Sequence, residues 1–250
     1  MTGVAWSDCG GLLIVYRQRW FVSLSASFFV VLYSTIGTAR AQTVGSITAL
    51  QGSAQDQRGK ATLPVTINMS VVLHDLLTTS AASSLVLLLT DNSRVSLSES
   101  AKLEVDEHLV GSGGGRGSTV LKLLSGSVHS LVSSSVGRAF NYQIRTSNSV
   151  IAVRGTDFEV DYTEGKARVG FNGCGIYTDV RVHDGIVEVL NPAHPQNKIE
   201  VTGGFATTVP CDAPPLNPGP LGLAAHAGVA GAVSALPPPA CPICVMVHPH

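Results

Sequence analysis

The stretch that decides the fold is residues 146–162, which read TSNSVIAVRGTDFEVDY. Hydrophobic residues alternate on both sides of its centre, and this is the period of a β-strand with one buried face. Arg154-Gly155-Thr156 interrupts the alternation. A glycine inside a strand pattern indicates a bulge or a bend, because glycine accepts backbone angles that other residues avoid. We therefore predict that Gly155 bends the chain, that the Thr156 hydroxyl bonds to local backbone, and that Phe158 packs in the next strand.

Two other segments share one pattern without a gap. Residues 121–131 read LKLLSGSVHSL and residues 180–190 read VRVHDGIVEVL, so that Gly126 and Gly185 occupy the same position. A glycine at this place predicts a tight bend between two short strands. A recurring strand–glycine–strand unit indicates stacked or rolled sheets, in which each unit buries its face on the next. The predicted class is all-β, with a solenoid-like or a sandwich-like arrangement of short strands.

Composition and charge agree with this class and limit the partners. The 250 residues include 26 glycines and carry a net charge of only −1, and residues that favour helices are sparse. Nucleic-acid binders carry a clustered basic surface that is absent from this sequence, so no nucleic-acid partner is predicted. The β module is expected over residues 42–211. The chain is rich in Pro, Ala and Gly over residues 212–250, which predicts a disordered tail.

Residues 1–41 are interpreted as a signal peptide. Two arginines precede an apolar core, and small residues stand at Ala39 and Ala41, the two positions that signal peptidase recognises. We expect cleavage after Ala41, with a mature protein that begins at Gln42 and is periplasmic or secreted. The alternative is an uncleaved anchor, because residues 20–38 come close to the length that spans a membrane. In that case the protein would contact the membrane only through this segment.

Four cysteines follow the signal segment, and in an exported chain they indicate disulfides, for which three connectivities exist. We predict a Cys174–Cys211 bond, because both residues lie inside or at the edge of the β module. Cys241 and Cys244 are local to the tail. Their C-x-x-C spacing also occurs in redox and zinc sites, which need a strand and a helix, or two further ligands. A tail disulfide or free thiols are predicted there instead, and no metal site is expected anywhere in the chain.

Six segments follow one another along residues 44–209: an opening strand at 45–52, Leu73-His-Asp75 with Leu77-Thr-Thr-Ser80, and residues 89–93, 124–128, 153–158 and 184–187. In this order they resemble the FecR domain, the periplasmic part of the iron-dicitrate regulator family. After the opening strand, the corresponding family motifs are "GD-x-I-x-T", "L-x-DGS" with Asn92 in place of glycine, "L-x-G-x-V", "RGTxF" and "eGxVxV". The resemblance implies a β module that senses or binds in the periplasm. Only 19 residues precede the apolar segment, too few to fold alone, so the family's cytoplasmic sigma-factor role is not expected here.

No pattern in the sequence predicts catalysis or a cofactor. His74-Asp75 and His183-Asp184 are adjacent pairs, and adjacent residues on a strand point to opposite faces. The sequence contains neither H-E-x-x-H nor G-x-S-x-G. The prediction is therefore a binding or sensing protein. A hydrolase with a site of another type is the least favoured alternative.

Arg154 is the candidate contact residue. It can form a surface ion pair with Asp157, Glu159 or Asp161, which alternate onto one face of the strand. It can instead anchor a protein partner, a role in which arginine is favoured, with Asp157 and Glu159 beside it. We predict a non-catalytic sensory or interaction module whose partner is an envelope protein. The alternative is a structural or carbohydrate-binding envelope protein, for which a row of exposed aromatic side chains would be the sign.

Overall fold

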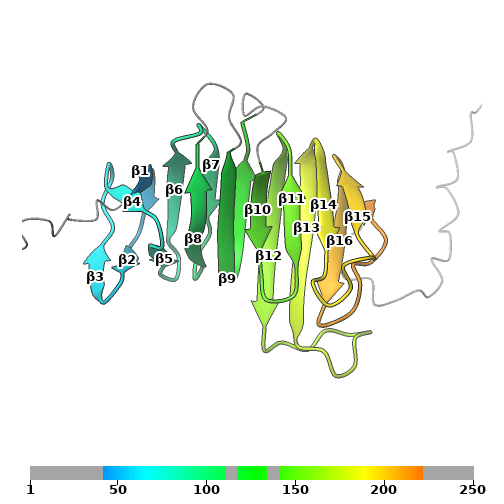
Figure 1. The fold of residues 1–250 in the computed structure, drawn as a ribbon. Helices are drawn as coiled ribbons and strands as arrows, with labels where there is room; N and C mark the ends of the chain where they lie inside the picture. Colours follow the sequence, from blue (N-terminus) through cyan, green and yellow to red (C-terminus); the bar gives the residue numbers. More distant parts are fainter. Residues whose placement is uncertain (1–41, 111–116, 134–140, 222–250) are drawn as a thin grey trace, which may run out of the picture. The chain divides into compact units, whose positions relative to one another are not determined.

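A computed structural model describes residues 42–110, 117–133 and 141–221, which Figure 1 shows as a ribbon. These residues form seventeen strands and no helix, so the predicted all-β class is confirmed. A helix with the length and apolar character to cross a membrane is accordingly absent from these ranges. The predicted signal peptide (1–41) and most of the predicted tail, with Cys241 and Cys244, lie outside the described residues.

Most of the strands are short. In chain order they are β1 (Thr43–Gln51), β2 (Ala54–Arg58), β3 (Ala61–Pro64), β4 (Ser70–Val72), β5 (Leu76–Thr79), β6 (Ser84–Leu89), β7 (Arg94–Leu97), β8 (Lys102–Leu109), β9 (Ser118–Leu131), β10 (Asn141–Arg145), β11 (Val150–Val153), β12 (Asp157–Glu164), β13 (Ile176–Asp184), β14 (Ile186–Leu190), β15 (Ile199–Thr202), β16 (Phe205–Pro210) and β17 (Gly219–Pro220).

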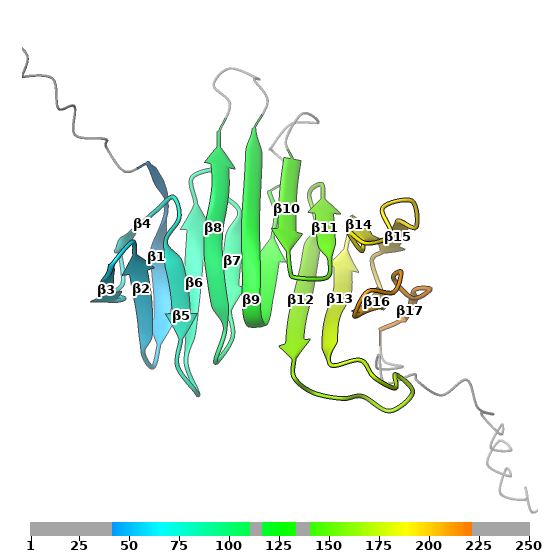
Figure 2. The ribbon, with the colours of Figure 1, turned by 60° about the horizontal axis from the view of Figure 1, so that its bottom comes forward.

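The strands form two sheets that share one long strand. Sheet A has the order β4-β1-β6-β7-β9-β12-β13-β16-β17. Sheet B has the order β3-β2-β5-β8-β9-β10-β11-β14-β15. Neighbours are antiparallel except β9 and β10, which are parallel. The first half of β9 belongs to sheet B and its second half to sheet A, and the bend between them can be followed in Figure 2.

The two sheets enclose one hydrophobic core. Along β12, Phe158 and Val160 are fully buried, while Asp157 and Glu159 face outward. The inward side chains of both sheets belong to one continuous hydrophobic cluster. It contains Leu87 from sheet A together with apolar residues from the strands of sheet B. The predicted stacking of sheets is thus confirmed. Of the two predicted arrangements, the sandwich-like one describes the structure. Alternating burial of this kind is what a sheet with one solvated face requires.

The chain changes sheet at corners that carry a residue with positive φ. At one edge of the module, the first margin, these residues are Gly52, Ala82, Ser100 and Gly126. At the opposite edge, the second margin, they are His74, Gly155, Gly185 and Gly204. The two margins lie at opposite ends of the β9–β12 ladder. Asp157 pairs with Leu131 near the second margin, and Tyr162 pairs with Gly126 at the first. The two repeated segments are therefore corners of opposite direction: from sheet B to A at Gly126 and from A to B at Gly185.

Residues 212–221, which the sequence assigns to the tail, continue along sheet A. The amide of Leu216 donates to the Thr208 carbonyl and the amide of Leu221 donates to the Gly204 carbonyl, 2.9 and 2.8 Å away. The prolines in this segment lack donors, and these two leucines supply them. The ordered chain thus extends past Cys211, the boundary expected from the sequence.

Candidate functional site

The Arg154-Gly155-Thr156 stretch forms the corner between β11 in sheet B and β12 in sheet A. Gly155 has a φ of 59°, in the left-handed region that favours glycine. Thr156 is buried, and its carbonyl accepts a hydrogen bond of 2.9 Å from the Val132 amide. The Thr156 hydroxyl has no hydrogen-bond partner within the described residues. The expected hydrogen bond from this hydroxyl to local backbone is therefore not formed within the described residues.

Three corners stack at the second margin and form what we call the corner row, residues 154–156, 185–186 and 203–205. A Cβ atom placed on Gly185 would lie 3.0 Å from the Gly155 carbonyl oxygen. The Gly203 amide donates to the Gly185 carbonyl at 2.9 Å. The corners are thus packed backbone against backbone. Their exposed side chains are Arg154, Ile186 and Phe205, and Leu131 at the end of β9 is exposed nearby, since it pairs with Asp157.

Two of the three carboxylates expected to pair with Arg154, Asp157 and Glu159, pair with other residues. The His129 imidazole contacts Asp157, and Arg181 lies 3.3 Å from Glu159 across the β12–β13 ladder. Arg154 itself is exposed and forms no ion pair with any residue in ranges 42–110, 117–133 or 141–221. The surface ion pair considered for Arg154 is therefore not formed in the structure, and cross-strand neighbours hold Asp157 and Glu159 instead.

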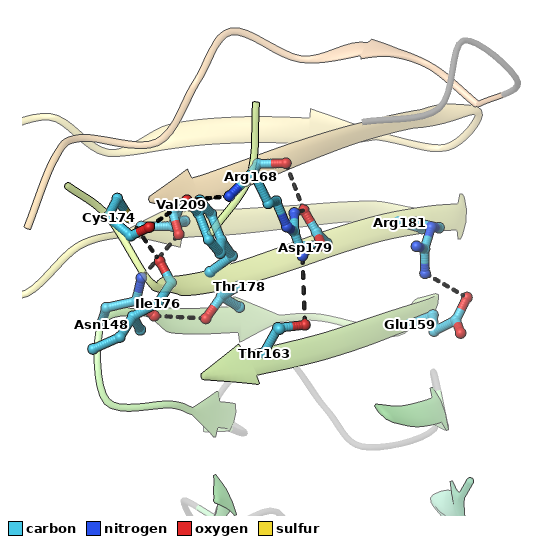
Figure 3. Close-up of polar contacts among 12 residues, drawn as sticks. Asn148, Glu159, Thr163, Arg168, Cys174, Ile176, Thr178, Asp179, Arg181 and Val209 are labelled. Carbon is cyan, nitrogen blue, oxygen red and sulfur yellow. Dashed lines mark hydrogen bonds and ion pairs between the residues drawn. The ribbon is translucent and has the colours of Figure 1, made fainter. Parts of the chain in front are cut away.

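A charged patch lies on the outward face of sheet A, close to the C-terminal end of β12, and Figure 3 shows its contacts. Arg168, in the connection between β12 and β13, returns over the sheet and bonds both oxygens of Asp179, at 2.9 and 2.7 Å. Its guanidinium also lies 4.3 Å from the centre of the Tyr177 ring. Asp161 stands opposite Asp179, and burial, followed by that neighbouring carboxylate, raises the pKa of Asp161.

The predicted Cys174–Cys211 disulfide is confirmed, with Cα atoms 5.8 Å apart. Cys174 belongs to the β12–β13 connection and Cys211 directly follows β16, so the bond fixes this connection to the end of sheet A. Beside it, the Thr178 hydroxyl donates to the Asn148 side chain, whose amide donates to the Val209 carbonyl. These contacts, drawn in Figure 3, join sheet B to sheet A at the same end of the module.

A buried ionic network lies in the N-terminal part. Arg58 bonds both carboxylate oxygens of Asp75, at 3.0 and 2.7 Å, and lies 3.0 Å from Asp56. Both acids are fully buried, and one oxygen of Asp56 has no partner within the described residues. Burial and the neighbouring Asp75 raise the pKa of Asp56 to about 6, against the opposing effect of Arg58. The network ties β2 to the turn before β5.

His74 points away from this network, as expected of a residue next to Asp75. It is exposed, whereas Asp75 is buried. The imidazole of His74 lies beside Glu104 and Asp106 of β8, and the potential ligand atoms of the three side chains are within 4.8 Å of one another. Sequence analysis missed this group because His74 is separated from the two acids by about thirty residues and only the pairing of β5 with β8 brings them together.

The aromatic side chains belong to the interior. Tyr142, Phe158, Tyr162 and Tyr177 are buried. Phe205, in the corner row, is the aromatic residue among the exposed large hydrophobics of the described ranges. A row of exposed aromatic side chains is therefore absent from the described residues.

Comparison with known proteins gives one family. Residues 75–188 match the family model described as FecR protein. Two crystal structures of "a putative anti-sigma factor" from Parabacteroides distasonis are similar at 15% identity, with TM-scores of 0.42 and 0.43. Each match covers 54% of this chain and 54% of the other, so the similarity spans about half of that protein's length. No curated protein matches the sequence. The family match runs from the start of β5 through most of β14 and includes the Arg154 corner, so this chain contains a FecR domain.

Proposed function

We propose that this chain is an exported sensory or protein-interaction module of the cell envelope, which binds a protein partner through the corner row and catalyses no reaction. The observation that carries this proposal is the FecR family match over residues 75–188. The match includes Arg154 and Gly185, the residues that build the first two corners of the row. The resemblance to this family implies that the domain senses or binds in the periplasm.

The chemistry of the corner row supports a protein partner. Arg154 presents a guanidinium that no acid among the described residues neutralises, and its donors fit the carboxylate of another chain. Ile186 and Phe205, in the other two corners of the row, expose 52% and 39% of their surfaces. Arginine and aromatic residues are enriched where interfaces are most strongly held. Because backbone contacts hold the three corners, little conformational freedom would be lost on binding.

The location of the protein rests on its first residues. The proposed cleavage after Ala41 releases a mature chain that begins at Gln42, one residue before β1. Mass spectrometry of the exported protein tests this. An intact segment 20–38 recovered with membranes would make the protein an anchored one and would leave the proposal for the corner row unchanged.

A carbohydrate-binding or purely structural role is the second candidate. Sugar-binding surfaces rely on exposed aromatic rings, and the described residues bury most of theirs. The surface features therefore favour a protein ligand over a polysaccharide.

Capture of partners from an envelope extract tests the proposal. The parent protein is compared with Arg154→Ala and with Arg181→Ala, a matched arginine on sheet A that is engaged by Glu159. Loss of a hot-spot arginine is expected to weaken capture by about 2 kcal/mol or more without changing the melting temperature. Equal capture by the parent and Arg154→Ala, with loss in Arg181→Ala, would move the contact surface to the face of sheet A.

A further inference from the structure

The group formed by His74, Glu104 and Asp106 lies on the outward side of sheet B, apart from the corner row. His74 occupies the turn between β4 and β5, and the two acids stand two residues apart on β8. The imidazole and carboxylate atoms that could bind an ion are within 4.8 Å of one another. His74 is exposed and both acids are partly exposed, so the group is open to solvent.

Backbone contacts fix this convergence. Glu104 faces outward from β8, and Asp106 lies where the β8–β9 register shifts between Val105 and Glu107, and it is also partly exposed. The amide of His74 donates to the carbonyl of Val105, the residue between the two acids, at 2.8 Å. The φ of His74 is 67°, and at this turn the chain directs Asp75 inward and leaves the imidazole outside, against β8. The three side chains thus come from two segments that are hydrogen-bonded at this point.

A cation already lies against this group. The Lys122 ammonium is 2.6 Å from one oxygen of Asp106, and Lys122 pairs with Glu104 across the β8–β9 ladder. The Lys122 side chain is 38% exposed, so its long stem can turn the ammonium into water. An ion that binds the two carboxylates would therefore replace the lysine instead of entering a closed cage.

We propose that His74, Glu104 and Asp106 bind a divalent first-row transition cation of the zinc class, which displaces Lys122 from Asp106. One imidazole nitrogen and two carboxylates are ligands that Zn²⁺ accepts, and three protein ligands leave a coordination position for water or another molecule. Mg²⁺ and Ca²⁺ prefer all-oxygen sites, so the imidazole selects against them. This inference does not depend on the proposed function of the corner row.

The test measures the rise in melting temperature that Zn²⁺ causes in the metal-free mature protein. A ligand that binds only the folded state raises its melting temperature. Cys241, Cys244, His248 and His250 are further potential ligands in the sequence, so the effect is assigned to the site by the variants below. We expect a rise with Zn²⁺ and none with the same concentration of Mg²⁺.

Three variants make the assignment specific. His74→Gly removes the imidazole and keeps a residue that accepts positive φ, and it should weaken zinc affinity by at least ~10-fold. Lys122→Met removes the competing ammonium and should strengthen zinc affinity. His129→Ala disrupts the other exposed histidine–carboxylate pair, with Asp157, and should leave the zinc effect unchanged. Each zinc effect is measured against the same variant without metal.

Two results would overturn the site. One is a zinc effect of equal size in the parent and His74→Gly, which would place the ion elsewhere. The other is the absence of any zinc effect in both the parent and Lys122→Met, which would show that these three side chains do not bind the cation even without their internal competitor.

Discussion

In the N-terminal half of the module, β1 to β9, the chain changes sheet at glycine and at non-glycine residues alike, among them His74, Ala82 and Ser100. In the C-terminal half, β10 to β17, the described corners have glycine at the left-handed position, at Gly155, Gly185 and Gly204. The backbone angle is similar in both halves, so the angle alone does not explain the difference.

Crowding and local compensation distinguish individual corners in both halves. A Cβ on Gly126 would lie 2.7 Å from the Ala101 Cα atom, and a Cβ on Gly185 would lie 3.0 Å from the Gly155 carbonyl oxygen. At the first margin, the amide of Ala82 is satisfied by the Glu99 carboxylate at 2.8 Å, and the corner has a polar contact of its own. A left-handed residue with a side chain costs about 1–2 kcal/mol, which such contacts can offset, whereas a clash with backbone adds to that cost.

The largest expected effect is therefore at Gly185. Gly185 and Gly204 have the same φ of 87°, but a Cβ on Gly185 would meet Thr156 and the Gly155 carbonyl, and one on Gly204 would meet nothing within 4 Å. Gly185→Ala should lower the free energy of unfolding by several kcal/mol or prevent folding. Gly204→Ala should cost only the backbone strain, about 1–2 kcal/mol. Chemical denaturation of both variants measures the difference, and equal losses would show that crowding plays no part.

The Gly155→Val variant extends this test to the corner that carries Arg154. A β-branched residue is disfavoured at positive φ, so this variant should unfold or misfold the module. Gly59, in the β2–β3 hairpin, has the same φ of 59° and open space around it, so Gly59→Val should show the backbone strain alone. The larger loss expected in Gly155→Val comes from the packing of its corner against Gly185. A Gly155→Val protein that melts like the parent would contradict the assignment of a required bend.

The disulfide is a second difference between the halves, because it stabilises only the C-terminal half. Its cysteines are 37 residues apart, and closing such a loop stabilises the folded state by about 3–4 kcal/mol in the chain-entropy model. The Cys174→Ser, Cys211→Ser double variant should lose this amount. The same exchange at Cys241 and Cys244 should leave the melting temperature unchanged, and a larger loss there would place the stabilising bond in the tail.

The buried Asp56 network gives the N-terminal half a dependence on pH. The folded protein raises the pKa of Asp56 from 3.8 to about 6, so it binds this proton more tightly than the unfolded chain does. The stabilising effect of protonation is present below pH 4 and is lost as the pH rises through 6, on the order of 2–3 kcal/mol. Asp56→Asn should flatten the free energy of unfolding between pH 4 and 6.5. Glu188→Gln, at an exposed ion pair with Lys198, should leave the profile as in the parent.

Features marked by a local pattern of residues could be predicted from the sequence, whereas features formed by contacts between distant residues could not. The glycine pattern located Gly126, Gly155 and Gly185, and the position of the cysteines located the disulfide. The corners at Ala82 and Ser100 went unseen because these residue types do not indicate positive φ.

The other differences between prediction and structure arise from the pairing of residues on neighbouring strands. Arg154 was expected to pair with acids close in sequence, but Arg181 and His129 lie opposite Glu159 on the two neighbouring strands, and His129 contacts Asp157 diagonally. The group of His74, Glu104 and Asp106 depends on the same long-range pairing. No local spacing in the sequence expresses either arrangement.

The smallest expected effect is at Thr156, in the crowded row itself. Its hydroxyl is buried without a partner in the described structure, and its methyl group faces Gly185. Thr156→Val keeps the shape and removes the unsatisfied oxygen, so it should leave stability unchanged or raise it by up to ~1–2 kcal/mol. A thermal melt that shows a loss of similar size would indicate that the hydroxyl has a partner after all.

The most direct test of the binding surface is site-specific photo-cross-linking in intact cells. A photoreactive phenylalanine derivative replaces Phe205 in the corner row and, as control, Ile67 near the opposite end of the strand order, which is 55% exposed. We expect that position 205 forms a discrete adduct with one envelope protein, that Arg154→Ala abolishes this adduct, and that position 67 forms none. An adduct from position 67 alone, or one from position 205 that is indifferent to Arg154→Ala, would contradict it.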